Sequence, residues 1–260
     1  MKTGRLARAA MLDFIIHIAR DAGRYLKDNL GTDLDVSFKG RINPVTRVDK
    51  ASQDMIIGAI SREFPGHSVI AEEGLTQETG SEYTWYVDPL DGTVNYIHGI
   101  PFFCVSIGLY KKGEPYLGVC YSPVLDELYS SEHGKGAFLN GRRIRVSPAA
   151  HLIDALVATG FPYLKDSLEG SLSRFARVLA QAQGIRRMGS AALDLCAVAR
   201  GSFDAFWEEG LSPWDIAAGM AIVREAGGVV TGFDGAAVDL SSGNVLAANG
   251  PLHGELLRLM

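Results

Sequence analysis

The stretch that most constrains this chain is residues 85–96, W-Y-V-D-P-L-D-G-T-V-N-Y, where two acidic residues come directly after an apolar run. The first three residues have side chains that favour a β-strand. The proline and the glycine are turn residues, so we expect a tight turn that brings the carboxylates of Asp88 and Asp91 together. Like charges this close repel each other unless a cation lies between them. The turn is therefore either exposed to solvent or part of a cation site.

Further acidic residues lie where a predicted strand ends or a predicted helix begins: Glu72, Glu73, Asp49 and Asp215. Each has a structural explanation when taken alone, as a helix cap, a turn residue or an exposed strand end. Taken with the two acids of the turn and the Leu90 carbonyl, they make an all-oxygen donor set that suits Mg²⁺ or Mn²⁺ rather than zinc. Since Mg²⁺ commonly shares its coordination shell with a substrate phosphate, the pattern predicts metal-assisted phosphoryl chemistry.

Composition excludes several other classes of protein. The chain has 260 residues, of which 47% are hydrophobic, and a net charge of −5, which is typical of a globular protein and not of one that binds nucleic acid or an anionic membrane. The three cysteines, Cys104, Cys120 and Cys196, lack metal-ligand spacing, and we expect reduced, buried thiols in a cytoplasmic protein. Charged residues interrupt the N-terminal apolar stretch, so we expect neither a signal peptide nor a membrane span there.

Hydrophobic periodicity predicts a helix over residues 5–30, closed by Gly31, and a second helix over residues 50–64 with Met55, Ile56, Ile60 and Phe64 on one side. Short strands are predicted at 68–71, 84–87, 103–110, 116–121 and 127–130, with hairpin loops at 111–114 and at Asn140-Gly141 between 137–140 and 143–146. After Pro148, strands at 155–159, 203–207 and 228–231 alternate with helices at 172–182, 191–199 and 216–226. We therefore expect an α+β part over residues 1–148 and an α/β part over residues 149–260, packed as one catalytic unit.

Six stretches occur in the order found in one known family: Asn43–Asp49 (N-P-V-T-R-V-D), Ala71–Gly74 (A-E-E-G), Trp85–Thr93 (W-Y-V-D-P-L-D-G-T), Gly136–Gly141 (G-A-F-L-N-G), Gly189–Ala192 (G-S-A-A) and Trp214–Gly219 (W-D-I-A-A-G). On these stretches the chain resembles the Mg²⁺-dependent, lithium-sensitive inositol monophosphatase family, whose relatives include fructose-1,6-bisphosphatases and sulfonucleotide phosphatases. The match spans about residues 36–250. It implies a layered α-β-α-β-α sandwich, an active phosphomonoesterase and a homodimer.

The resemblance also implies roles for the matched residues. The metal ligands, for two or three Mg²⁺ ions or Mn²⁺ in their place, would be Glu72, Asp88, Asp91, Asp215 and the Leu90 carbonyl. The catalytic residues would be Asp49, Thr93 and Glu72, with Asp49 and Thr93 orienting the attacking water. The phosphate would contact the amides of Gly92 and Thr93. The rest of the substrate would contact Asp91, Gly189, Ser190, Ala191 and Glu208. Lys39 and Glu73 would be accessory residues, although Lys39 is equally well explained as an exposed loop lysine. Asn43 stands where the family often has aspartate, which removes one local charge.

The expected reaction is hydrolysis of a phosphomonoester by a metal-activated water, without a covalent intermediate. Inositol-1-phosphate is the leading substrate, and fructose-1,6-bisphosphate and nucleotide or histidinol phosphates are alternatives. Glu208 can accept hydrogen bonds from two vicinal hydroxyls, or it is a plain surface acid at a strand end. Arg186 and Arg187 fit a second phosphate site, a subunit contact or a solvated face. A regulatory protein that uses the fold as an interaction surface is an alternative from another class. A metal-dependent nuclease is disfavoured by the acidic net charge.

Overall fold

A computed structural model describes residues 2–39, 44–162 and 168–260. Its helices are α1 (Lys2–Asn29), α2 (Arg47–Glu63), α3 (Thr93–Ile97), α4 (Leu168–Leu179), α5 (Ala191–Ala199), α6 (Pro213–Glu225) and α7 (Gly250–Leu257), with a short 3₁₀ turn at Leu152–Asp154. Its strands are β1 (Ser37–Phe38), β2 (Pro44–Val45), β3 (Ser68–Ala71), β4 (Thr76–Gln77), β5 (Tyr83–Asp91), β6 (Cys104–Lys111), β7 (Glu114–Ser122), β8 (Glu127–Glu132), β9 (Gly136–Leu139), β10 (Arg142–Ile144), β11 (Leu156–Thr159), β12 (Gly184–Arg186), β13 (Ala205–Glu208), β14 (Val229–Thr231) and β15 (Val245–Ala248).

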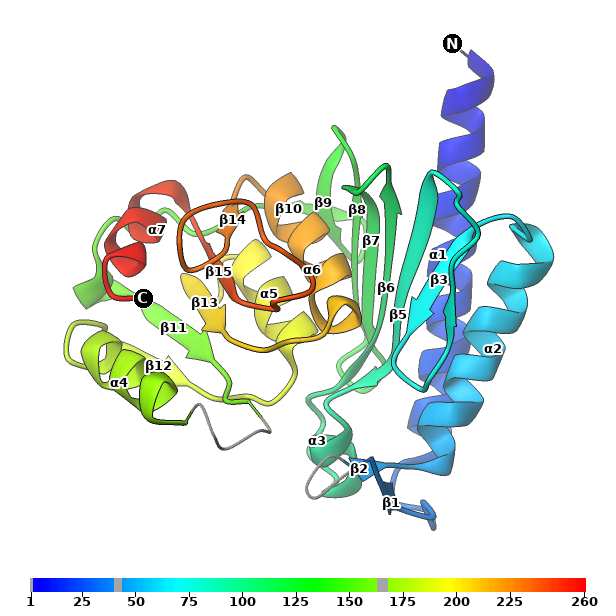
Figure 1. Ribbon diagram of the computed structural model, residues 1–260, viewed down its shortest axis with the longest axis horizontal. Coiled ribbons are helices and arrows are strands. Elements are labelled where there is room, and N and C mark those ends of the chain that lie inside the picture. The colour runs from blue at the N-terminus through cyan, green and yellow to red at the C-terminus, as the bar shows by residue number, and fades with distance from the viewer. Residues whose placement is uncertain (1, 40–43, 163–167) are drawn as a thin grey trace.

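These elements form five layers (Figure 1). An eight-stranded sheet has the order β10-β9-β8-β7-β6-β5-β3-β4, and a five-stranded sheet has the order β12-β11-β13-β15-β14. Helices α1 and α2 cover the outer face of the larger sheet, α5 and α6 lie between the two sheets, and α4 and α7 cover the far side of the smaller one. The expected α-β-α-β-α sandwich is therefore confirmed. The division of the chain at residue 148 into two parts remains a prediction.

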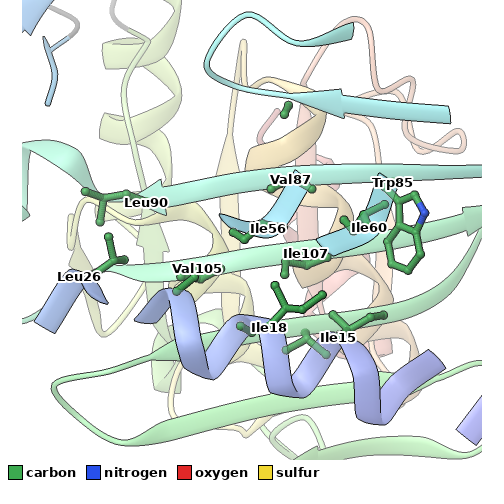
Figure 2. Close-up of a cluster of buried hydrophobic side chains, with 14 of the residues drawn as sticks. Ile15, Ile18, Leu26, Ile56, Ile60, Trp85, Val87, Leu90, Val105 and Ile107 are labelled. Carbon is green, nitrogen blue, oxygen red and sulfur yellow. The ribbon is translucent and has the colours of Figure 1, made fainter. Parts of the chain in front are cut away.

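The outer core lies between α1, α2 and the large sheet. Figure 2 shows Ile15 and Ile18 of α1 facing Val105 and Ile107 of the sheet, and all four side chains are buried. The buried positions of α1 recur at steps of three and four residues, which places one face of the helix against the sheet. The predicted helix over 5–30 is confirmed by α1.

Helix α6 lies unusually close to the large sheet because two paired glycines face it. Gly108 on β6 and Gly118 on β7 are register partners. A Cβ at Gly118 would lie 2.6 Å from the Ala218 carbonyl oxygen, and one at Gly108 would lie 3.0 Å from the Ala218 amide nitrogen. The missing side chains let the α6 backbone approach the sheet, and this contact fixes the N-terminal turn of α6, with Asp215, at the end of β5.

The expected tight turn at residues 88–91 is wrong. Strand β5 continues through all four residues, and a bulge between Asp88 and Asp91 places them opposite Ser106 and Cys104 of β6. A bulge adds one residue to a strand and redirects side chains without ending the pairing. The chain turns one residue later, at Gly92, whose φ of 94° is in the left-handed region that glycine tolerates best. Of the two predicted turn residues, Gly92 therefore turns the chain, whereas Pro89 lies within the strand.

Other predicted boundaries need smaller corrections. Helix α2 begins at Arg47 instead of residue 50, so Asp49 lies inside its first turn and not before it. Met55 is 40% exposed and does not share the buried face of Ile56 and Ile60. The predicted hairpin turn at Asn140-Gly141 is confirmed, with φ of 49° and 76° at the two residues. The short elements α3, β1, β2, β4 and β12, and also β15 and α7, were not predicted from the sequence. No helix in the described ranges has both the length and the apolar character needed to cross a bilayer.

Candidate active site

One cavity gathers most of the predicted site residues at the junction of the two sheets. Strands β3 and β5 are parallel neighbours, so Glu72, which follows β3, lies beside the end of β5. The cavity is lined by the following predicted residues: Lys39, Glu72, Asp88, Leu90, Asp91, Gly92, Thr93, Gly189, Ser190, Ala191, Glu208 and Asp215. Asp49 and Glu73 do not line it, but each forms a hydrogen bond with a residue that does. Asn43 lies outside the described residues.

Three aspartates that line the cavity, Asp88, Asp91 and Asp215, each accept a hydrogen bond from a backbone amide. Asp88 Oδ1 accepts a hydrogen bond of 2.9 Å from the Leu90 amide, across the bulge. Asp91 Oδ2 accepts one of 2.8 Å from the Ala192 amide in the first turn of α5. Asp215 Oδ2 accepts one of 2.7 Å from the Ser212 amide, which forms part of the capping box of α6. In each pair, one carboxylate oxygen is used for orientation.

These acids lack a cationic partner among the described residues. Burial raises the pKa of Asp88 well above its usual range, and the charges of Glu72 and Asp91 raise it further. Burial also raises the pKa of Asp215, with the charges of Asp91 and Glu72 acting in the same direction. Burial raises the pKa of Asp91 to about 7, even though hydrogen bonds from Ser190 and Ala192 favour its ionised form. A group of buried carboxylates that repel one another indicates that a positive charge belongs among them.

Lys39, a cation that lines the same cavity, is paired with other acids. Its Nζ lies 2.9 Å from Glu72 Oε1 and also forms a hydrogen bond with Glu73 Oε1. The Glu73 backbone is held in turn by the side chain of Gln53, in a reciprocal pair of hydrogen bonds of 2.8 and 3.3 Å. Lys39 thus bridges the loop before α2 and the end of β3, and it neutralises the two glutamates instead of the three aspartates.

The donor set fits a hard divalent cation in its chemistry. Carboxylate and carbonyl oxygens line this part of the cavity, and its lining contains no histidine or cysteine from the residues that the structure describes. No three His, Cys, Asp or Glu side chains in the described ranges converge tightly enough to hold an ion as they stand. Lys39 contacts Glu72, and a backbone amide occupies one oxygen of Asp88, Asp91 and Asp215.

Asp49 and Thr93 form a second polar pair at the cavity. Asp49 is fully buried, and its Oδ2 accepts hydrogen bonds from the amide and hydroxyl of Thr46, at 2.8 and 2.5 Å. Its Oδ1 lies 3.1 Å from Thr93 Oγ1, which also lies 3.0 Å from the Leu90 carbonyl oxygen. The threonine hydroxyl has one proton and so donates to one of these acceptors at a time. When it donates to Asp49, its oxygen lone pairs can accept a hydrogen bond from a water molecule, and that bond would orient the water.

The opposite end of the cavity has a different set of polar groups. Glu208 ends β13 and is 9% exposed, and burial raises its pKa to about 8 while the nearby charge of Arg187 opposes that rise. Arg187 lines the cavity and Arg186 does not. Gly160 and Asp194 also line it. The sequence analysis named neither, although Asp194 is the one charged residue in the apolar run 191–199 and that contrast could have revealed it.

Comparison with known proteins agrees with this architecture. The family model described as "Inositol monophosphatase family" matches residues 8–260. An inositol-1-monophosphatase of Mesorhizobium japonicum is 44% identical over 257 residues, 97% of each chain. A Nus factor SuhB of Pseudomonas aeruginosa is 42% identical over 247 residues, which cover 92% of this chain and 91% of that protein.

Among solved structures, the extragenic suppressor protein suhB from Bartonella henselae superposes with a TM-score of 0.92 at 40% identity, covering 96% of this chain and 98% of that one. Its fold and the fold of this chain are therefore the same over nearly their full lengths. With the whole-chain family match and the acidic cavity between the two sheets, this places the protein in the inositol monophosphatase family, and it is a phosphatase that acts on small-molecule phosphomonoesters.

Proposed function

We propose that the protein hydrolyses myo-inositol-1-phosphate to inositol and phosphate in a Mg²⁺-dependent reaction. The observation that carries the proposal is the group of buried aspartates, Asp88, Asp91 and Asp215, with no cation beside them in the described residues. These three, with Glu72 and the Leu90 carbonyl, would hold two or three Mg²⁺ ions. The metal would supply charge neutralisation of the phosphate and a more acidic water. Mn²⁺ would serve as a substitute.

The chain's own residues would position the reactants. The buried Asp49 would accept a hydrogen bond from the Thr93 hydroxyl, whose oxygen would in turn accept one from the attacking water and keep that water on one side of the phosphate. The amides of Gly92 and Thr93, at the cavity wall, would donate hydrogen bonds to the phosphate oxygens. Positioning and charge stabilisation account for most of the catalysis of phosphoryl transfer, so no protein nucleophile is required.

The distal end of the cavity would bind the inositol ring. Glu208 is buried and presents a carboxylate that can accept bonds from two hydroxyls. Gly189, Ser190 and Ala191 lie at the start of α5 and line the same cavity. Asp91 would contact both the metal and a ring hydroxyl, which would couple metal binding to substrate orientation. We propose in addition, from the family resemblance, that lithium inhibits the reaction and that the protein is a cytoplasmic homodimer.

Two other functions have specific support. Arg187 lines the cavity and forms no ion pair within 4 Å in the described ranges, which favours a second phosphate on the substrate, as in fructose-1,6-bisphosphate. One relative bears the name Nus factor, which favours a regulatory role on the same fold. Asp194 and Glu208 lie near Arg187, and these two acids would repel a second phosphate. For this reason we rank inositol monophosphate first among the candidate substrates.

The test is phosphate release in Mg²⁺ from myo-inositol-1-phosphate, fructose-1,6-bisphosphate, histidinol phosphate and a sulfonucleotide, with and without lithium. We expect the highest kcat/KM for inositol phosphate and suppression by lithium. Asp88→Asn keeps the acceptor of the Leu90 amide but removes one charge from the cluster, so turnover should fall at least ~10²-fold and the Mg²⁺-induced rise in Tm should shrink. Preference for another phosphate ester would change the substrate, and wild-type activity that survives in Asp88→Asn would overturn the role of the cluster.

A further inference from the structure

Asp194 is a buried acid of the cavity whose hydrogen bonding is incomplete. It lies in the first turn of α5 and is 1% exposed, and its Oδ1 has no hydrogen-bond partner in the described part of the chain. Its neighbours on α5 are apolar and buried. The residue nonetheless lines the active-site cavity. In an α-helix, a side chain leans toward the N-terminal turn, and the residues on that side of Asp194, 189–191, line the same cavity.

An unpaired buried carboxylate oxygen is costly for a folded protein. Leaving such a group without a partner destabilises a protein by roughly 1–3 kcal/mol, and more for a charged group. A purely structural role is a poor explanation, because an apolar side chain at this place in an otherwise apolar helix would avoid the cost. Because Asp194 lines the cavity, a small rotation of its side chain would bring this buried oxygen to a partner that enters there.

The surroundings of Asp194 indicate the chemistry of that partner. Burial raises the pKa of Asp194 well above its usual range, the charge of Glu208 raises it further, and Arg187 opposes the rise. Two acids at the same end of the cavity repel a second phosphate, whereas a hydroxyl group can donate to one carboxyl and accept from the other. The ligand at this end is accordingly neutral and rich in hydroxyls.

We propose that Asp194 is a specificity-determining residue that, together with Glu208, receives hydroxyl groups of a polyol monophosphate remote from its phosphate. This inference rests on the proposed function of the cavity and adds a residue to it. Sites built to hydrogen-bond a substrate hydroxyl discriminate strongly against analogues that lack it, because the buried protein group is then left unpaired. Asp194 would make the enzyme prefer a polyol phosphate to a simple aryl phosphate.

The experiment compares kcat/KM for myo-inositol-1-phosphate with kcat/KM for phenyl phosphate, which has no hydroxyls, in wild type, Asp194→Asn and Asp194→Leu. We expect the ratio of the two values to fall roughly 10- to 100-fold in Asp194→Leu and less in Asp194→Asn, which keeps one acceptor. Ser122→Ala is the matched control, since it removes another fully buried, unpartnered oxygen that does not line the cavity. Its ratio should stay at the wild-type value.

An unchanged ratio in both Asp194 variants would overturn the inference, as would an equal fall for both substrates accompanied by a fall in Tm. Binding of myo-inositol itself, measured by ligand-observed NMR in Mg²⁺, separates this inference from the proposed function. If the wild type binds myo-inositol but hydrolyses no phosphate ester, the proposed function is refuted. The role of Asp194 in binding hydroxyls is still supported in that case if Asp194→Asn weakens the binding of myo-inositol. A wild type that turns over inositol phosphate with no loss of myo-inositol binding in either variant would refute the role of Asp194 alone.

Discussion

Replacing Gly160 by alanine tests whether the position of Glu208 controls substrate choice. Gly160 follows β11, and Glu208 ends the neighbouring parallel strand β13, so the two residues lie side by side. A Cβ at Gly160 would lie 2.1 Å from each carboxylate oxygen of Glu208. Contacts of a real Cβ begin near 3.0 Å, so the carboxylate must retreat by about 0.9 Å, the difference between 3.0 and 2.1 Å.

The expected effect is large for activity and small for stability. Gly160 has no positive φ, so alanine fits its backbone conformation. By itself this change stabilises the folded protein by about 0.4–1 kcal/mol, because alanine lowers the conformational entropy of the unfolded chain. The Glu208 carboxylate can swing into the cavity instead of disturbing the core. A displacement of about 1 Å in a positioning group can lower the rate about 10²-fold. We therefore expect kcat/KM for myo-inositol-1-phosphate to fall about 10²-fold while Tm changes by no more than a few degrees.

The assay is steady-state phosphate release, together with thermal denaturation of each variant. Gly66→Ala is the control, because its added Cβ would have open space around it and its φ is also not positive. If Gly160→Ala retains activity on inositol phosphate within twofold while its Tm is unchanged, then Glu208 does not bind the substrate from this position. A fall in Tm by ten degrees or more would show instead that the Glu208 carboxylate cannot move into the cavity, which would contradict our premise that it can.

Two further predictions concern Asp91 and its partners. In metal-free protein the pKa of Asp91 is held at about 7, above the 3.8 of an exposed aspartate, so the folded state binds this proton more tightly than the unfolded chain does. The resulting stability is fully present below about pH 4 and is lost as the pH rises through 7. The Tm of the metal-free protein should therefore fall over this range, and saturating Mg²⁺ should reduce the slope of Tm against pH. A metal-free Tm that stays flat or rises would contradict this prediction. Ser190 donates a 2.5 Å hydrogen bond to Asp91, and its hydroxyl oxygen caps α5 by accepting a hydrogen bond from the Leu193 amide. Ser190→Ala should therefore lower the free energy of unfolding, measured in urea, by about 2–4 kcal/mol. Ser190→Thr, which keeps the hydroxyl, should retain most of this stability. A loss below about 1 kcal/mol in the alanine variant would show that neither contact is formed.

The sequence by itself determined the local structure and the chemistry of the donor set. Periodicity located α1, and turn chemistry located the Asn140-Gly141 hairpin, because both signals depend on residues close together in the chain. The capping box at Asp215 was equally local. The resemblance of short motifs then gave the family and the layered fold, which the structure confirms.

The tertiary structure decided how these residues meet. The bulge at Asp88–Asp91 arises from pairing with β6, and no signal within residues 85–96 distinguishes it from a turn. Met55 is apolar yet exposed, because it lies about 100° around α2 from Ile56, which is buried. Gly160 and Asp194 joined the cavity only through the parallel pairing of β11 with β13 and the packing of α5 between the sheets. Local sequence thus specifies elements and donor atoms, while burial, pKa shifts and the neighbours of each acid depend on contacts between residues far apart in the chain.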